Sequence, residues 1–186
     1  MTAVAALTAL VLCVLGAQVP SSEAWARADV ATRRLPPDAF SGLPQLLRAE
    51  LRQRGCTVPQ VYTGGRLHNV IRGQFNDGNE ADWAVLCSRQ RESSILIFWD
   101  GRPTHIDEIA HSPDLQFLQV VAPGQIGFSR EISVASPDFI LERHRRYGGP
   151  KPPALTHAGI DDAFLGKASQ VWYWHRGKWL QLTGAD

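Results

Sequence analysis

The chain has 186 residues, of which 44% are hydrophobic, so it can form one domain of ordinary size with a substantial core. Its 19 Lys and Arg residues nearly balance its 18 Asp and Glu residues, and this balance argues against a nucleic-acid partner or an anionic-membrane partner. After the first apolar run no segment approaches the length of a membrane span, so we expect membrane contact only during export.

The N-terminal segment predicts an export signal. Residues 3–16 are an apolar run that is too short to span a bilayer and is typical of the central region of a signal peptide. Ala24-Trp25-Ala26 has the small-x-small pattern that a signal peptidase needs, and Leu15-Gly16-Ala17 is a second candidate. No Lys or Arg precedes the apolar run, so a buried N-terminal helix remains an alternative. We predict a signal peptide over residues 1–26 and a secreted or periplasmic protein.

A linker and then a helix are expected next. Residues 27–37 are polar and end in two prolines, which predicts a linker or an extended lead-in before a single α+β domain over residues 38–186. Apolar side chains at spacings of three and four predict a helix over about 39–54: Phe40, Leu43, Leu46, Leu47 and Leu51. Asp38 can cap this helix, and Gly55 is a natural stop.

Residues 69–101 predict an antiparallel meander with strands over 69–75, 82–88 and 93–99. The first connection contains the turn formers Asn76, Asp77, Gly78 and Asn79, and the second connection is short and charged. The second and third strands do not alternate cleanly between apolar and polar residues. We therefore expect both faces of the sheet to be covered.

Two cysteines remain after cleavage at Ala26, which removes Cys13. Cys56 follows the predicted helix directly, and Cys87 lies in the middle strand of the meander. Two cysteines in an exported chain most often pair, because the compartment is oxidising. We expect a disulfide that joins the C-terminal end of the helix to the sheet, with a pair of buried free thiols as the alternative.

The rest of the chain is rich in strand patterns. Strands are expected within 115–121 and 125–135, on either side of Pro123-Gly124. Ser136 and Pro137 predict a helix to about residue 146, with a strand over 139–147 as the alternative. Residues 168–184 predict an aromatic-rich hairpin with its turn at 175–178. The expected fold is α+β, with a mainly antiparallel sheet of about six or seven strands and the N-terminal helix packed on it.

Residues 73–86, GQFNDGNEADWAVL, followed after a polar gap by SSILIFWDG, resemble one blade of the FG-GAP or VCBS type. Gly73, Phe75, Asn76 and Asp82 match that repeat. The resemblance implies a local β-blade and a calcium-stabilised module in which Asn76, Asp77 and Asp82 are candidate ligands. Gln74 and Gly78 stand where the repeat has acidic ligands, and calcium takes about six to eight oxygens. Ordinary hairpin chemistry without an ion is the alternative.

His157 with Asp161 and Asp162 is the candidate catalytic set. If residues 157–165 form a helical turn, His157 and Asp161 lie four residues apart on one face, and the carboxylate can orient the imidazole for proton transfer. This arrangement would serve a small exported hydrolase-like enzyme. A helix-capping contact is the alternative.

Two further groups are candidates for binding a partner. Arg143, Arg145 and Arg146 could bind a phosphate, a sulfated sugar or an acidic partner, or form a solvated face. Trp172 and Trp174 could form a platform for a sugar or a protein, or pack in the core. No nucleophile motif accompanies these groups. The expected function is therefore a non-enzymatic binding or envelope-associated domain that needs no cofactor and has a protein or glycan partner.

Overall fold

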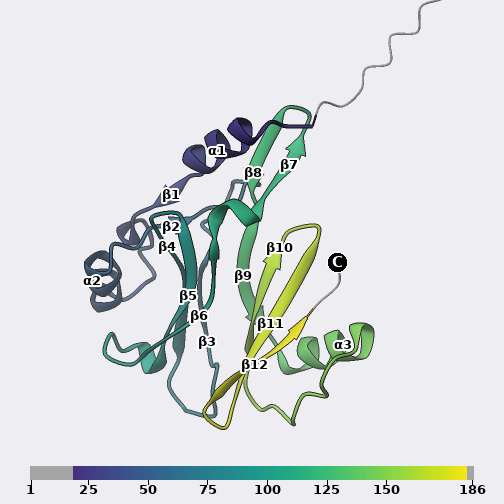
Figure 1. Cartoon of the computed structure of the whole chain (residues 1–186). Coiled ribbons are helices and arrows are strands. Elements are labelled where there is room, and N and C mark those ends of the chain that lie inside the picture. The colour runs from purple at the N-terminus through teal and green to yellow at the C-terminus, as the bar shows by residue number, and fades with distance from the viewer. Residues whose placement is uncertain (1–18, 184–186) are drawn as a thin grey trace, which may run out of the picture.

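A computed structural model describes residues 19–183, which form an α+β fold in four layers (Figure 1). The helices are α1 (Ser22–Ala31), α2 (Gln45–Gln53) and α3 (Pro137–Tyr147). Helix α2 covers one four-stranded sheet, a second four-stranded sheet packs on the other face of the first, and α3 covers the outside of the second. Every strand pairing in the described chain is antiparallel, as predicted.

The first sheet is the predicted meander extended by one strand. Its order is β3-β4-β5-β6, with bounds Val70–Gly73, Asp82–Arg89, Glu92–Phe98 and Ile106–Pro113. A tight turn joins β4 to β5 at Gln90 and Arg91, both of which have positive φ. The three predicted strands are therefore confirmed, within the usual uncertainty of strand ends.

The second sheet contains the later strands of the chain. Its order is β12-β11-β10-β9, with bounds Lys178–Thr183, Ala168–His175, Gly159–Phe164 and Arg130–Ala135. The predicted C-terminal hairpin is β11 and β12. A separate hairpin, β7 (Leu118–Ala122) with β8 (Gln125–Phe128), turns at Pro123-Gly124 as expected. The strands are thus divided between two main sheets and two small pairs, the second pair being β1 (Arg34–Leu35) with β2 (Val58–Pro59).

Both faces of the first sheet are covered, as the lack of alternation predicted. On one face Val85, Cys87, Leu96 and Phe98 pack against α2 and the residues around it. On the other face the core between the two sheets is formed mainly by aliphatic and aromatic side chains: Phe75, Ala84, Leu86, Ile95, Ile97, Trp99, Ile132 and Ile160. We call this second cluster the inner core.

Asn69 links the two sheets where β3 lies beside β9. Its side-chain amide donates to the carbonyl oxygen of Arg130 over 3.0 Å and accepts from the backbone N–H of Ile132 over 2.9 Å. The residue is buried and has a φ of 71°, a conformation that asparagine tolerates better than most residues.

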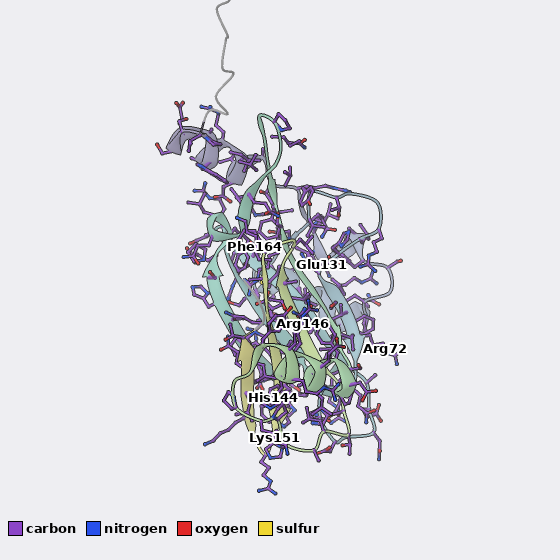
Figure 2. All side chains as sticks on the ribbon, turned by 90° about the vertical axis from the view of Figure 1, so that its right-hand side faces the viewer. Arg72, Glu131, His144, Arg146, Lys151 and Phe164 are labelled. Atoms are coloured by element: carbon purple, nitrogen blue, oxygen red, sulfur yellow. A yellow bond between two sulfur atoms is a disulfide. The ribbon has the colours of Figure 1, made fainter. Side chains whose placement is uncertain are left out.

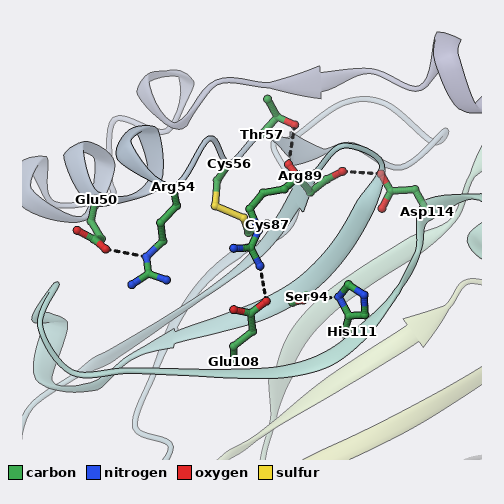
Figure 3. The surroundings of a disulfide bond; sticks show 11 residues. Glu50, Arg54, Cys56, Thr57, Cys87, Arg89, Ser94, Glu108, His111 and Asp114 are labelled. Atoms are coloured by element: carbon green, nitrogen blue, oxygen red, sulfur yellow. Dashed lines mark hydrogen bonds and ion pairs between the residues drawn. A yellow bond between two sulfur atoms is a disulfide. The ribbon is translucent and has the colours of Figure 1, made fainter.

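The predicted disulfide is present between Cys56 and Cys87, whose Cα atoms lie 5.1 Å apart (Figure 3). Cys56 follows α2, and Cys87 lies in β4, so the bridge joins the end of the helix to the sheet. Thr57 continues this attachment, because its backbone exchanges two hydrogen bonds with Ser88. The domain is disulfide-stabilised.

Helix α2 is shorter than the predicted 39–54. Residues 37–39 form a separate helical turn, and α2 begins after Pro44, which has an extended ψ of 142°. Phe40 and Leu43 still enter the core ahead of the helix, whereas Leu46 is 67% exposed. The apolar spacing therefore identified the buried residues correctly except for Leu46, and it overestimated the length of the helix.

Helix α3 is confirmed, and the alternative strand is not formed. Ser136 caps it by accepting a hydrogen bond from the N–H of Phe139, and Pro137 occupies its first turn. Ile140 is fully buried against a cluster from the second sheet that includes Ala135, Val171 and Tyr173.

The segment expected to be a linker, 27–37, is instead largely regular structure. It contains the second half of α1 and strand β1. Trp25 and Ala28 of α1 pack against the inner core, and Asp29 pairs with Arg34 over 2.7 Å. The predicted cleavage point after Ala26 lies within α1. The apolar run and the alternative cleavage point at Ala17 lie outside the described residues.

None of the helices found in residues 19–183 has the length and apolar character needed to cross a membrane.

Candidate functional site

The helical turn that the candidate set of His157, Asp161 and Asp162 required is not formed. Residues 159–164 form strand β10, which pairs with β9 and β11 on its two sides. Successive side chains of a strand point to opposite faces, so Asp161 faces α3 and Asp162 faces the inner core. His157 precedes the strand and is buried, with its Nδ1 atom 3.0 Å from the carbonyl oxygen of Ala158. The three residues do not form the expected set.

Asp162 belongs to a buried ion pair with Arg130. Two oxygens of Asp162 accept from the guanidinium at 2.8 Å each, and both side chains are almost fully buried. The other N–H groups of Arg130 donate to Ser93 and to the carbonyl oxygen of Ala110, on β5 and β6. The ring of Phe117 covers the guanidinium at 4.4 Å. This network ties the second sheet to the first, and both oxygens of Asp162 are engaged by Arg130.

Asp161 lies on the other side of β10, beneath α3. Burial raises the pKa of its carboxyl group, and the nearby Arg143 and Ser169 offset this only in part. Its Oδ1 atom is buried and has no hydrogen-bond partner among residues 19–183. No histidine of the described chain forms a hydrogen bond or an ion pair with Asp161, so a His–carboxylate pair for proton transfer is not formed there.

The candidate calcium ligands do not present their oxygens to a common ion. Asp82 is fully buried, and its two oxygens accept from the backbone N–H groups of Phe75, at 2.8 Å, and Asp100, at 2.9 Å. Asn76 accepts from the N–H of Gly78, and Asp77 accepts from the hydroxyl of Thr156, both at 2.6 Å. In the part of the chain that the structure describes, no group of three or more His, Cys, Asp and Glu side chains could hold a metal. The residues present therefore do not fit calcium.

Asp82 instead joins two loops. By binding Phe75 and Asp100 it ties the β3–β4 connection to the β5–β6 connection. Desolvation raises the pKa of Asp82, although the two backbone N–H groups favour its charged form. Asp100 has a φ of 54°, so the second loop is tightly bent at this point.

Three tryptophans from both sheets meet next to these loops. Trp99 directly follows β5, and Trp174 and Trp179 come from the last hairpin. The ring centroid of Trp99 lies 5.0 Å from that of Trp174 and 5.6 Å from that of Trp179. The indole N–H of Trp179 donates to Asp107 of β6 over 2.9 Å. We call Trp99, Trp174 and Trp179 the tryptophan cluster.

A cleft of about 490 Å³ opens beside the tryptophan cluster. It lies where the β3–β4 connection, the β5–β6 connection and the β11–β12 turn come together at one end of the molecule (Figure 1). Its aromatic lining consists of Trp99, Trp174 and His105, and its polar lining consists of Asn76, Asp77, Asp100 and Arg176, with Gly78 between them. Trp99 is almost fully buried, whereas Trp174 is partly exposed and His105 is exposed.

The two predicted platform tryptophans have different surroundings. Both pack against the inner core, which is the alternative that the sequence left open. Trp174 also lines the cleft, but Trp172 does not.

Sequence reasoning missed Trp99, Asp100, His105 and Arg176 as cleft residues. The meander alone places the β3–β4 and β5–β6 connections at the same end of a sheet, so part of this signal was available.

The three candidate arginines lie on α3, over the outer face of the second sheet (Figure 2). The guanidinium of Arg143 lies 4.8 Å from the ring centroid of Phe139 and 5.6 Å from that of Tyr147. Arg146 lies 5.3 Å from the centroid of Tyr147. A second cleft, of about 270 Å³, is lined by Phe139, Arg143, Arg146, Tyr147 and Glu142.

Comparisons of this chain with models of protein families, with curated proteins and with solved structures find no match. The resemblance of residues 73–101 to an FG-GAP or VCBS blade therefore stays a prediction.

Proposed function

We propose that this protein is an exported binding domain that takes a saccharide in the cleft beside Trp174. The apolar run at residues 3–16 supports export, and the disulfide between Cys56 and Cys87 supports an oxidising compartment. Secretion and residence in a periplasm are equally consistent with these features.

The observation that carries the proposal is the partly exposed ring of Trp174 in the wall of a cleft. Sugars present apolar C–H faces that pack on aromatic rings, and tryptophan offers the largest such surface. The ring of Trp174 packs against those of Trp99 and Trp179, at centroid distances of 5.0 and 5.6 Å. Because its neighbours already restrict the rotation of the Trp174 side chain, binding a ligand costs this residue little further conformational entropy.

The polar lining suits the hydroxyl groups of a sugar. Asp77 and Asp100 supply acceptors, Arg176 supplies donors, and Asn76 supplies an amide group. Small-molecule sites combine an aromatic surface with a few convergent polar groups of this kind. Asp82 holds two of the lining loops in place by binding Phe75 and Asp100.

The test is isothermal titration of the chain with a panel of neutral trisaccharides built from glucose, N-acetylglucosamine, mannose and galactose. We expect one of them to bind, and we expect Trp174→Phe and Asp100→Asn each to weaken binding at least about tenfold, which corresponds to ~1.4 kcal/mol. Trp172→Phe is the matched control, because Trp172 lies on the same strand and the same face but outside the cleft.

The proposal fails if no sugar in the panel binds, or if Trp172→Phe weakens binding as much as Trp174→Phe. Circular dichroism of each variant separates loss of the site from loss of the fold.

A further inference from the structure

The last turn of α3 and the segment after it carry an unbalanced positive charge. Residues 143–151 contain Arg143, Arg145, Arg146 and Lys151 together with His144, and they contain no acid. None of these arginines forms an ion pair within residues 19–183. The arginines at the end of α2 differ in this respect, because Arg52 pairs with Asp38 and Arg54 pairs with Glu50.

Aromatic rings hold two of these guanidiniums in place. Arg143 lies between the rings of Phe139 and Tyr147, and Arg146 also contacts Tyr147. Each contact favours the cation over the ring face and restricts a side chain that is otherwise very flexible. Arginines that are already ordered lose less entropy when they bind an anion, so this arrangement favours binding over simple solvation.

The basic residues extend from α3 into the segment that follows it, so together they cover more surface than one small anion can contact. Figure 2 shows Arg146, His144 and Lys151 one below another on this side of the molecule, whereas the acid Glu131 lies higher up, away from α3. Glu142 is the one acid in the lining of the cleft beside Tyr147, which disfavours a compact anion at that point. Charges spread along a helix and the following segment suit a linear polymer that carries several anionic groups.

We propose that this surface, formed by Arg143, Arg145, Arg146, Tyr147 and Lys151, binds an acidic polysaccharide. Its sulfate or carboxylate groups meet the guanidiniums, which form charge-assisted hydrogen bonds with such groups. A nucleic acid fits less well, since single strands need open aromatic faces for base stacking and the rings of Phe139 and Tyr147 already contact guanidiniums. The surface is separate from the cleft beside Trp174, so the two sites are tested independently.

The experiment uses heparin as the probe and measures the dissociation constant of the chain at several salt concentrations. The test variant is Arg145→Gln with Arg146→Gln, and the matched control is Arg52→Gln with Arg54→Gln, which removes the same charge from another helix. We expect the test variant to bind about tenfold more weakly and its salt slope to fall by roughly two, while the control behaves as the wild type.

The proposal is overturned if wild type does not bind heparin at low salt, or if the two double variants weaken binding equally. It is also overturned if duplex DNA displaces heparin at equal charge concentration, because the surface would then respond to phosphate charge alone. Thermal unfolding of both variants checks that the fold is intact.

Discussion

Arg130 is a cation in the interior of the protein, with a side chain that is 1% exposed. Its bidentate pair with Asp162 and its bonds to Ser93 and Ala110 satisfy the guanidinium between the two sheets. A buried pair adds little net stability compared with apolar residues, but the loss of one partner leaves an uncompensated charge. The loss of either partner should therefore be costly, because the remaining charge stays buried between the two sheets.

Asp162→Asn is expected to lower the free energy of unfolding by about 3–5 kcal/mol. The comparison is Glu108→Gln, which removes one partner of the surface pair with Arg89, where the side chains are 36% and 38% exposed. That change should cost less than about 1 kcal/mol. Urea unfolding of both variants measures the difference, and equal costs would contradict a structural role for the buried pair.

Asp161 should contribute to the pH dependence of stability. Burial raises the pKa of this carboxyl group above its ordinary value of 3.8, so the folded chain holds the proton more tightly than the unfolded chain. The contribution of Asp161 to stability therefore falls as pH rises from the ordinary pKa through the raised pKa. Asp161→Asn removes this effect, and the variant should gain stability relative to wild type as pH rises.

Urea unfolding of wild type and Asp161→Asn between pH 3.5 and 7 gives this difference as a function of pH. A variant that becomes relatively less stable towards pH 7 would show that the charged carboxylate is favoured by the fold, contrary to the raised pKa.

Among the elements, α2 shows that a regular spacing of buried apolar residues can extend beyond the end of a helix. Leu47 and Leu51 are fully buried against the first sheet, while Phe40 and Leu43 reach the same core from the segment before the helix. Pro44 lacks a backbone N–H and holds an extended ψ, so the chain turns into the helix only after it. The apolar period continues through both segments because both pack on one surface.

Leu47→Ala is expected to lower the free energy of unfolding by about 2–5 kcal/mol, since it leaves a cavity under α2. The neighbouring Leu46 is 67% exposed, so Leu46→Ala should change stability by less than about 0.5 kcal/mol. Chemical unfolding of the two variants checks this. Similar losses from both would show that α2 does not pack through Leu47.

At the scale of the whole molecule, α1 bears on where the mature chain begins. Cleavage after Ala26 would remove Trp25, which packs against the inner core, and would divide α1. Cleavage after Ala17 would keep both, together with Ser21, which caps the helix. If the chain is exported as we propose, we expect cleavage after Ala17 and a mature chain that begins at Gln18, and the intact mass of the purified protein measures this directly.

A chain that begins at Arg27 should be less stable than one that begins at Gln18 by about 1–3 kcal/mol, which is the typical contribution of burying one large apolar side chain. Thermal unfolding of the two chains, with Trp25→Ala in the longer one, tests the cause. If the two chains melt together, α1 is not part of the stable fold.

Most of the helices and strands could be predicted from the amino-acid sequence, because their signals are local. The meander followed from turn formers between apolar runs, α3 followed from Ser136 and Pro137, and the bridge followed from Cys56 directly after a helix and Cys87 within a strand. Each signal depends on residues close together in the chain, or on the covalent pair of Cys56 and Cys87.

The lining of the cleft and the strand conformation of β10 depend on contacts between distant parts of the chain. Residues 157–165 contain no strong local signal, and pairing with β9 and β11 on both sides made 159–164 a strand. Trp99 and Trp174 meet because two sheets pack face to face, and Arg130 finds Asp162 for the same reason. Contacts between residues so far apart in the chain depend on the relative placement of whole sheets, and no local pattern specifies that placement.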